Sequence, residues 1–128
     1  CWEIPGLCPL GAVSFQRLFN TAIANILSRY INKGILIDGD DLMVQDEFVG
    51  TDEKVRQSGK VSVSITYSKD NVTLGHTGIN IIAGDKAPPF AYSSNLTNDQ
   101  AYEFMSAVIE YFNAEVRDQF IATTKIIV

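Results

Sequence analysis

The residues best suited to hold a metal ion lie in one short acidic stretch. It contains one glycine and four carboxylates, Gly39, Asp38, Asp40, Asp41 and Asp46. Carboxylate oxygens on a loop are the ligands that calcium prefers. The spacing departs from that of an EF-hand loop, which has a glycine at its sixth position and a bidentate glutamate at its twelfth. The pattern therefore favours a solvated acidic surface or a cluster of turns and caps, with a calcium or small-ligand site as the alternative.

The single histidine, His76, is the residue best suited to acid–base chemistry. The apolar positions around it change parity between Leu74 and Ile79, and we therefore predict a β-bulge between Gly75 and Gly78. A bulge can aim a side chain into an active site, and a nearby carboxylate would make His76 the centre of a small hydrolase. The chain has no second histidine and no G-x-S-x-G, H-E-x-x-H or phosphate-loop motif. A surface or edge-strand position is favoured, and the hydrolase is kept as an alternative.

The two cysteines, Cys1 and Cys8, allow two modifications. In an oxidising compartment a disulfide between them would close a small loop around Pro5 and Gly6. The chain begins with Cys1, and at this single residue it resembles the bacterial lipoproteins, which carry their lipid on a leading cysteine. Two cysteines are too few to form a metal site by themselves. We expect an extracytoplasmic protein, in a cell envelope or secreted, or a component of a virion.

Apolar and aromatic residues in three irregular or terminal segments are the candidates for binding a partner protein. Prolines and glycines within residues 1–13 argue against a continuous helix or strand there, so we expect an irregular arm, packed on the domain or docked on a neighbour. The Pro88-Pro89 pair favours an extended path, on which the aromatic residues that follow either contact a partner or plug the core. The candidates are Trp2, Ile4, Pro88, Pro89, Phe90, Tyr92, Ile126 and Val128.

Composition excludes several classes of partner. The chain has 128 residues, of which 46% are hydrophobic and 20% charged, as expected of one folded domain. Fifteen acidic and ten basic residues give a net charge of -5, and the basic residues are scattered. Because phosphate and anionic lipid surfaces require clustered Lys and Arg, we expect no nucleic-acid partner and membrane contact only through a lipid on Cys1. No cofactor motif is present, and we expect no cofactor.

A β-hairpin over residues 60–82 is expected to form the centre of the sheet. Apolar side chains alternate with hydroxyls from Val61 to Ser68. Successive side chains of a strand point to opposite faces, so the alternation gives one apolar and one hydroxyl-bearing face. The polar run Lys69-Asp70-Asn71 is typical of a hairpin turn. We expect the hydroxyl face to lie opposite the helices, solvated or covered by a partner.

Two amphipathic helices should cover this sheet. The first is predicted to begin at Ser14 as the N-cap and to end before Gly34. The second should begin with a capping box formed by Thr97 and Gln100 and end near Gln119.

The complete pattern predicts an α+β fold. Short strands are expected at 35–37 and 42–49, and a final β-rich strand at 120–128 that is buried in the sheet or paired with another subunit. Two helices then pack on one face of a four- to five-stranded, mainly antiparallel sheet in the order α-β-(β)-β-β-α-β. Residues 1–13 form the arm, and residues 14–128 form a single domain.

These observations favour a non-catalytic protein–protein interaction or assembly subunit. Catalytic motifs are missing, whereas the arm, the Pro-Pro-Phe segment and the apolar C-terminal run offer anchors for arm docking or strand addition. The expected partners are other protein subunits, including further copies of the same chain.

Overall fold

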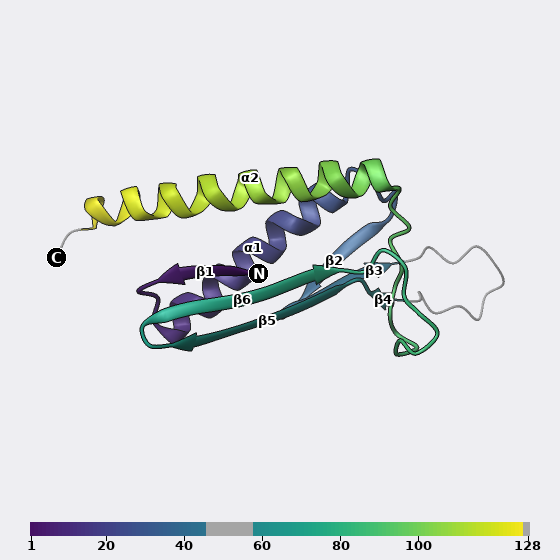
Figure 1. Ribbon diagram of the computed structural model, residues 1–128, viewed down its shortest axis with the longest axis horizontal. Coiled ribbons are helices and arrows are strands. Elements are labelled where there is room, and N and C mark those ends of the chain that lie inside the picture. The colour runs from purple at the N-terminus through teal and green to yellow at the C-terminus, as the bar shows by residue number, and fades with distance from the viewer. Residues whose placement is uncertain (46–57, 127–128) are drawn as a thin grey trace.

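The computed structural model describes residues 1–45 and 58–126. It is an α+β fold with two helices and two three-stranded antiparallel sheets, ordered β1-β6-β5 and β2-β3-β4 (Figure 1). The elements are β1 (Trp2–Pro5), α1 (Pro9–Leu27), β2 (Gly34–Asp38), β3 (Asp41–Gln45), β4 (Ser58–Lys60), β5 (Ser62–Lys69), β6 (Val72–Ile79), α2 (Asn98–Ala122) and a final 3-10 turn, η1 (Thr123–Lys125). The α+β class is confirmed, whereas the prediction of one four- to five-stranded sheet is wrong in that the strands form two sheets.

The two sheets meet where the chain passes from β4 to β5. The amide of Val61 donates to the carbonyl of Leu42 in β3 (3.0 Å), and its own carbonyl accepts from the amide of Asn80 (2.8 Å). The Ser62 hydroxyl accepts from the amide of Leu42 (2.9 Å). Because one short segment is bonded to both sheets, the position of the hairpin is fixed relative to β3.

The β5–β6 hairpin forms as predicted but has no bulge. Its turn residues Asp70 and Asn71 have φ of +52° and +63°, the left-handed conformation of a tight two-residue hairpin turn. The pairing is unbroken from Lys69↔Val72 to Ser62↔Ile79, so the predicted bulge is wrong. The change in parity of the apolar residues needs no bulge, because the indole of Trp2 fills the space beside Gly75. A Cβ at Gly75 would stand 1.9 Å from Cε2 of Trp2.

The face of the hairpin that packs on α1 is the hydroxyl face, contrary to expectation. The Ser64 hydroxyl lies under α1 and accepts from Nε2 of Gln16 (3.0 Å) and Nδ2 of Asn20 (3.2 Å). The same amide of Asn20 also donates to the carbonyl of Asp40 (3.0 Å). Gln16 and Asn20 are both buried, so polar groups of α1 meet polar groups of β5. Because these groups have partners only in this orientation, the alternate residues of β5 turn outward.

The N-terminal segment is regular, and the predicted irregular arm is wrong. Residues Trp2–Pro5 pair with β6, and Gly6 turns the chain with a φ of +81°. Helix α1 then begins at Pro9 rather than after Ser14, with Cys8 as its N-cap. Proline is compatible with a first helical position because the amide that it lacks would have no intrahelical partner. The helix ends at Leu27 rather than before Gly34.

Helix α2 begins with the predicted capping box of Thr97 and Gln100 and extends further than predicted. It continues to Ala122 and passes into η1, so the predicted terminal strand is wrong for the residues described up to Ile126. β-branched residues have only a weak intrinsic preference for strands, and an established helix gains one hydrogen bond for each added residue. Neither helix is long and apolar enough to cross a membrane, within the part of the chain that the structure describes.

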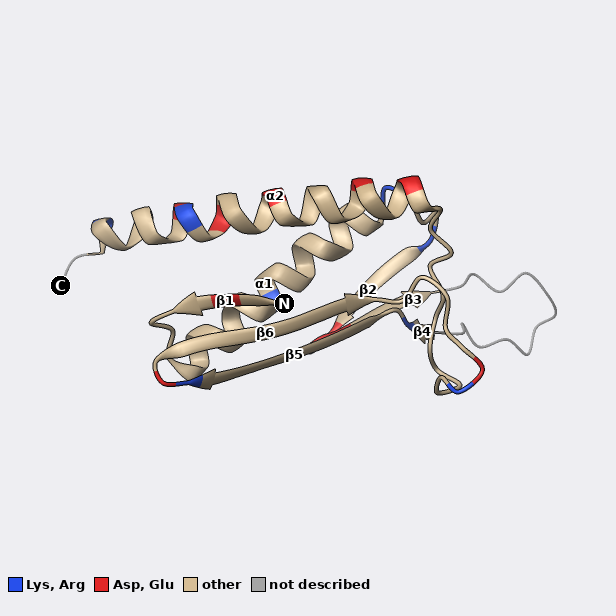
Figure 2. Cartoon of the chain, viewed as in Figure 1, with Lys and Arg blue, Asp and Glu red and all other residues tan. Residues whose placement is uncertain are grey.

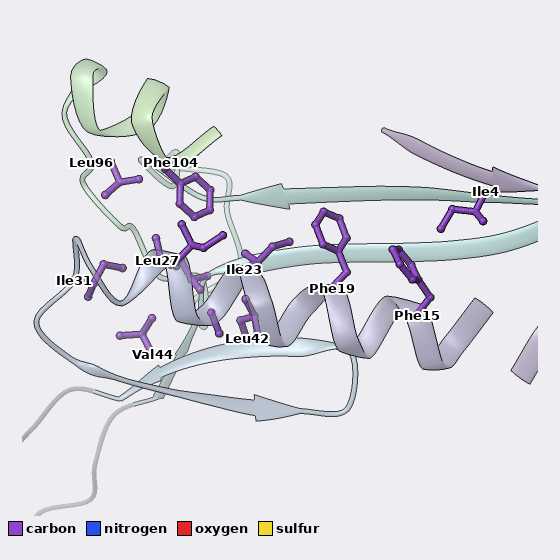
Figure 3. Packing of buried hydrophobic residues seen from close by; sticks show 13 residues of the cluster. Ile4, Phe15, Phe19, Ile23, Leu27, Ile31, Leu42, Val44, Leu96 and Phe104 are labelled. Atoms are coloured by element: carbon purple, nitrogen blue, oxygen red, sulfur yellow. The ribbon is translucent and has the colours of Figure 1, made fainter. Parts of the chain in front are cut away.

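The core lies between α1, β3 and the sheet junction (Figure 3). Ile23 and Leu27 of α1 pack there with Leu42 and Val44 of β3, and each of the four side chains is at most 2% exposed. A second, aromatic part of the core lies nearer the start of α1, where Trp2, Phe15, Phe19 and Phe112 meet with ring centroids 5.3 to 6.1 Å apart. Because Trp2 touches rings of both helices, α1 and α2 lie on the same side of the β1-β6-β5 sheet.

Candidate functional site

An apolar groove of about 550 Å³ lies between α2 and the β1-β6-β5 sheet. One wall is a face of α2 that carries Phe104, Met105, Val108, Ile109 and Phe112. The other wall is formed by Trp2, Thr77 and Ile79, and the side chains of Phe19 and Ile23 reach it from α1. Among the residues that the structure describes, no charged side chain lines it. A concave, mostly apolar space with a few polar groups at its edge is the usual form of a binding site.

The groove exists because α2 has more apolar surface than the fold buries. Phe104 is the single buried residue among the 25 of α2, and Met105 and Ile109 remain 54% and 55% exposed. The acidic and basic residues of α2 are spread along its length (Figure 2), but none of them is among the residues of the groove. The wall that α2 contributes is therefore uncharged.

Trp2 fixes the inner corner of the groove. Its ring packs edge-on against Phe15 (centroids 5.3 Å apart) and also contacts Phe112 of α2 (5.9 Å). Its indole N–H donates to the hydroxyl of Thr77 (3.3 Å). Ile4 lies in the same strand and is buried. The structure thus places Trp2 and Ile4, two of the residues predicted to bind a partner, in internal packing.

The contact between α1 and α2 behind the groove is made by uncharged aromatic groups. The ring of Tyr111 in α2 stacks on Phe19 at a centroid distance of 6.4 Å. Burial raises the pKa of the Tyr111 phenol above its ordinary value of 10.0, and the carboxylate of Glu115 adds to the increase. The phenol therefore stays uncharged through the neutral pH range.

A thiol and an imidazole meet at the start of β1, where Cys1, at the rim of the groove, contacts His76, which lies on the outer face of the sheet beside Ile65. Sγ of Cys1 lies 3.4 Å from Nδ1 of His76, and both residues are exposed. Sequence reasoning missed this pair because its members are 75 positions apart. No local signal in the sequence could have found it, because only the pairing of Trp2 with Gly75 sets Cys1 opposite His76. Among the described residues no carboxylate bonds to His76, so the structure offers no support for the predicted hydrolase pairing.

The structure separates the two cysteines. Both thiols are free, so the disulfide allowed by the sequence is not formed. Sγ of Cys8 instead accepts a hydrogen bond from the amide of Gly11 (3.3 Å) and caps α1, whereas Sγ of Cys1 contacts His76.

The acidic residues of the β2–β3 turn are occupied by cations of the protein itself. Asp40 pairs with Arg17 (3.3 Å), and Asp41 pairs with Lys60 (2.9 Å). Asp38 is exposed, and Asp46 lies outside the described residues. No group of three or more potential ligands occurs in residues 1–45 and 58–126, so the described part of the chain provides no cluster for the calcium alternative.

The Pro-Pro-Phe segment divides between surface and packing. Pro88 and Pro89 are exposed, and so is Phe90. Tyr92 turns inward, with Cβ only 2.6 Å from the position that a Cβ on Gly59 would occupy, and with Nζ of Lys33 over its ring at 5.3 Å. The sequence left open whether these aromatic residues contact a partner or plug the core. Phe90 is exposed, whereas Tyr92 packs against the core. At the other end of the chain Ile126 is exposed, and Val128 lies outside the described residues.

The outer face of the hairpin is a second apolar surface. Val63, Ile65 and Tyr67 point away from α1 and are 43%, 57% and 56% exposed. Figure 2 shows the hairpin without charged residues except at its turn, where Lys69 and Asp70 lie. We refer to Val63, Ile65 and Tyr67 as the hairpin face.

Function has to be inferred from these surfaces. The groove and the hairpin face are both apolar, and His76, which contacts Cys1, lies beside Ile65 of the hairpin face. Among known proteins, no family model matches this chain, and no curated protein or solved structure matches it either.

Proposed function

We propose that this chain is a non-catalytic assembly subunit that binds further copies of itself through the hairpin face. The observation that carries the proposal is the orientation of β5, which turns Ser64 toward α1 and exposes Val63, Ile65 and Tyr67. Fully burying an apolar side chain of this size stabilises a protein by about 1.5–3 kcal/mol. An isolated subunit forgoes much of that energy on three side chains, and an assembled subunit recovers it.

The shape of the hairpin face supports a contact with another sheet. Its three side chains alternate along one strand, as they do on the inner faces of two packed sheets. The three side chains are themselves uncharged, and the same outer face also carries Glu3, paired with Leu74, and His76, paired with Ile65. The same patch on both copies would suffice for a two-fold contact.

Area limits how strong this contact is by itself. Eight residues at about 3.3 Å each and three strands at about 4.8 Å each give the sheet an outer area of roughly 300–400 Å². A stable interface buries about 800 Å² on each partner. The hairpin face would therefore supply less than half of a stable interface, and assembly would require a second surface.

The test is the mass of the native protein at micromolar concentration, measured by light scattering and native mass spectrometry. We expect an oligomer whose mass falls in Ile65→Lys, because a lysine on the hairpin face would have to be desolvated on assembly. Leu36→Lys is the matched control, since Leu36 is 51% exposed and lies on β2 rather than on the hairpin. A wild-type protein that is strictly monomeric across this range would contradict the proposal.

The Cys1–His76 pair favours a second candidate function, chemistry at the Cys1 thiol. An imidazole at 3.4 Å can take the proton of a thiol and so activate it as a nucleophile. The test is alkylation by iodoacetamide followed by mass spectrometry. The candidate requires that Cys1 react faster than Cys8 and that His76→Ala remove the difference, and equal rates in the wild type would eliminate it.

A further inference from the structure

The Cys1–His76 pair lies on the same side of the sheet as the hairpin face. His76 of β6 is paired with Ile65 of β5, and the thiol of Cys1 contacts His76 from the other side. Trp2 points inward to the rings of α1, so the side chain of the preceding Cys1 points outward. Cys1, His76 and Ile65 therefore form one row across the outer face of the sheet, and all three are exposed.

The distance within the pair is the distance between two ligands of one zinc ion. Zinc binds sulfur at about 2.3 Å and imidazole nitrogen at about 2.0–2.1 Å, in a tetrahedral arrangement. Such bonds place the two ligand atoms about 3.5–3.6 Å apart. Sγ of Cys1 lies 3.4 Å from Nδ1 of His76. The spacing also suits a thiol hydrogen bond, but it means that the pair can hold a metal ion without rearrangement of the backbone.

One chain supplies half of such a site. A structural zinc ion takes four ligands. Within residues 1–45 and 58–126 no group of three or more histidine, cysteine or acidic residues could hold a metal ion. A two-fold contact repeats every residue near its axis. Two copies that meet at this row would provide two thiolates and two imidazoles, which is one of the usual ligand sets of structural zinc.

We propose that two copies of the chain bind one zinc ion between them, through Cys1 and His76 of each copy. This inference deepens the proposed function and rests on it, because the two-fold contact at the hairpin face brings the two pairs together. Thiolate and imidazole ligands select zinc over calcium or magnesium. Each thiol releases its proton to solvent as it binds. The four bonds to the metal add binding energy that the small area of the hairpin face does not supply.

One orientation of the two copies satisfies both the metal and the apolar contact. When the two-fold axis runs along the row of Cys1, His76 and Ile65, each residue of the row faces its own copy. Stacked sheets lie about 10 Å apart, so an ion on the axis lies about 5 Å from each sheet. A cysteine or histidine side chain and a metal bond of about 2.0–2.3 Å together span about that distance. An ion on the axis also requires one zinc for two chains.

The residues on either side of the row fit this orientation. Val63 and Gly78 form the next row on one side, and Tyr67 and Leu74 form the next row on the other. The rotation exchanges these rows, so Leu74 of one copy lies over Gly78 of the second copy. Beside Gly78 there is room for it, because no atom beyond the sequence neighbours lies within 4 Å of the position of a Cβ. Glu3 is paired with Leu74, so the two Glu3 carboxylates fall on opposite sides of the axis and do not meet.

The experiment titrates zinc into the reduced chain and follows mass and metal content together. Native mass spectrometry should show a dimer that carries one zinc ion. In sedimentation, zinc should lower the chain concentration at which half of the protein is dimeric at least tenfold. Cys1→Ser and His76→Gln should each abolish this effect. Cys8→Ser is the matched control and should retain it, since Cys8 caps α1 and a serine caps a helix equally well.

Three results would overturn the proposal. They are a zinc content of one ion per chain, zinc that leaves the mass unchanged, and an effect of zinc that survives in Cys1→Ser.

Cobalt(II) in place of zinc identifies the ligands. A tetrahedral site with two thiolates should give visible ligand-field absorption and a thiolate-to-cobalt charge-transfer band, both complete at half an equivalent of cobalt per chain. Zinc should also slow the alkylation of Cys1 by iodoacetamide at least tenfold and leave that of Cys8 unchanged. A missing charge-transfer band, or equal protection of the two thiols, would contradict the site.

The two proposals fail in different ways. The mass of the metal-free chain and of Ile65→Lys depends on the hairpin face, whereas the response to zinc depends on Cys1 and His76. A metal-free chain that oligomerises but does not respond to zinc would remove the zinc site and leave the proposed function intact. A zinc dimer that forms equally well in Ile65→Lys would retain the metal bridge and contradict the contact at the hairpin face.

Discussion

The two helices are both amphipathic, but they contribute to the molecule in different ways. Helix α1 has 19 residues, of which nine are buried, including the polar Gln16 and Asn20. Helix α2 has 25 residues and buries only Phe104. The first helix is surrounded by both sheets and by α2, whereas the second packs along one side and leaves a groove. The difference teaches that α1 carries the packing of the core, whereas α2 leaves much of its apolar surface uncovered.

The largest effect should follow from Phe19→Ala in α1. Phe19 is 5% exposed and contacts the rings of Trp2, Phe15 and Phe112, so its loss leaves a cavity. We expect the free energy of unfolding to fall by about 3–5 kcal/mol, as measured by urea denaturation. Ile109→Ala in α2 is the control, with an expected change within about 0.5 kcal/mol. Equal losses in the two variants would break the comparison.

A smaller loss should follow from Asn20→Ala. The amide of the buried Asn20 bonds to the Ser64 hydroxyl and to the carbonyl of Asp40, and in the variant each of these partly buried groups loses one partner. We expect a loss of about 1–3 kcal/mol in the free energy of unfolding. Asn25→Ala, exposed on the same helix, should change it little. If Asn20→Ala were neutral, the polar contact would not be what turns the hydroxyl face inward.

A local loss should follow from Thr97→Ala at the start of α2. The Thr97 hydroxyl accepts the amide of Gln100 (3.2 Å), and an N-cap contributes about 1 kcal/mol. Because few residues of α2 are buried, we expect faster amide exchange in the first turn of α2 and little change in α1. Exchange that increases equally in both helices would show that α2 unfolds only together with the core.

The smallest effect should appear at alkaline pH, at the contact between the two helices. Folding raises the pKa of Tyr111, so its contribution to stability is complete below the unfolded pKa of about 10 and is lost as pH rises above it. Thermal melts between pH 9 and 11 should therefore fall less steeply for Tyr111→Phe than for the wild type. The same slope in both proteins would assign the alkaline loss to other groups.

The candidate site shows where sequence reasoning reached its limit. The chemistry of the acidic stretch and of His76 could be weighed from residue types, but their neighbours could not be known. Asp40 meets Arg17, and His76 meets Cys1, through contacts between residues 23 and 75 positions apart. The groove could not be predicted at all, because it depends on how much of α2 the core leaves uncovered.

The sequence by itself determined the local elements. The turn at Asp70 and Asn71, the capping box of Thr97 and Gln100 and the amphipathic patterns of both helices depend on interactions within a few residues. The tertiary structure alone decided which face of the hairpin is buried. Alternation defines two faces but does not rank them, and the choice was made by the buried Gln16 and Asn20, whose amides find a hydrogen-bond partner on the hydroxyl face. The pairing of β1 with β6 and the helical end of the chain are likewise decided by contacts distant in sequence, which a local pattern does not contain.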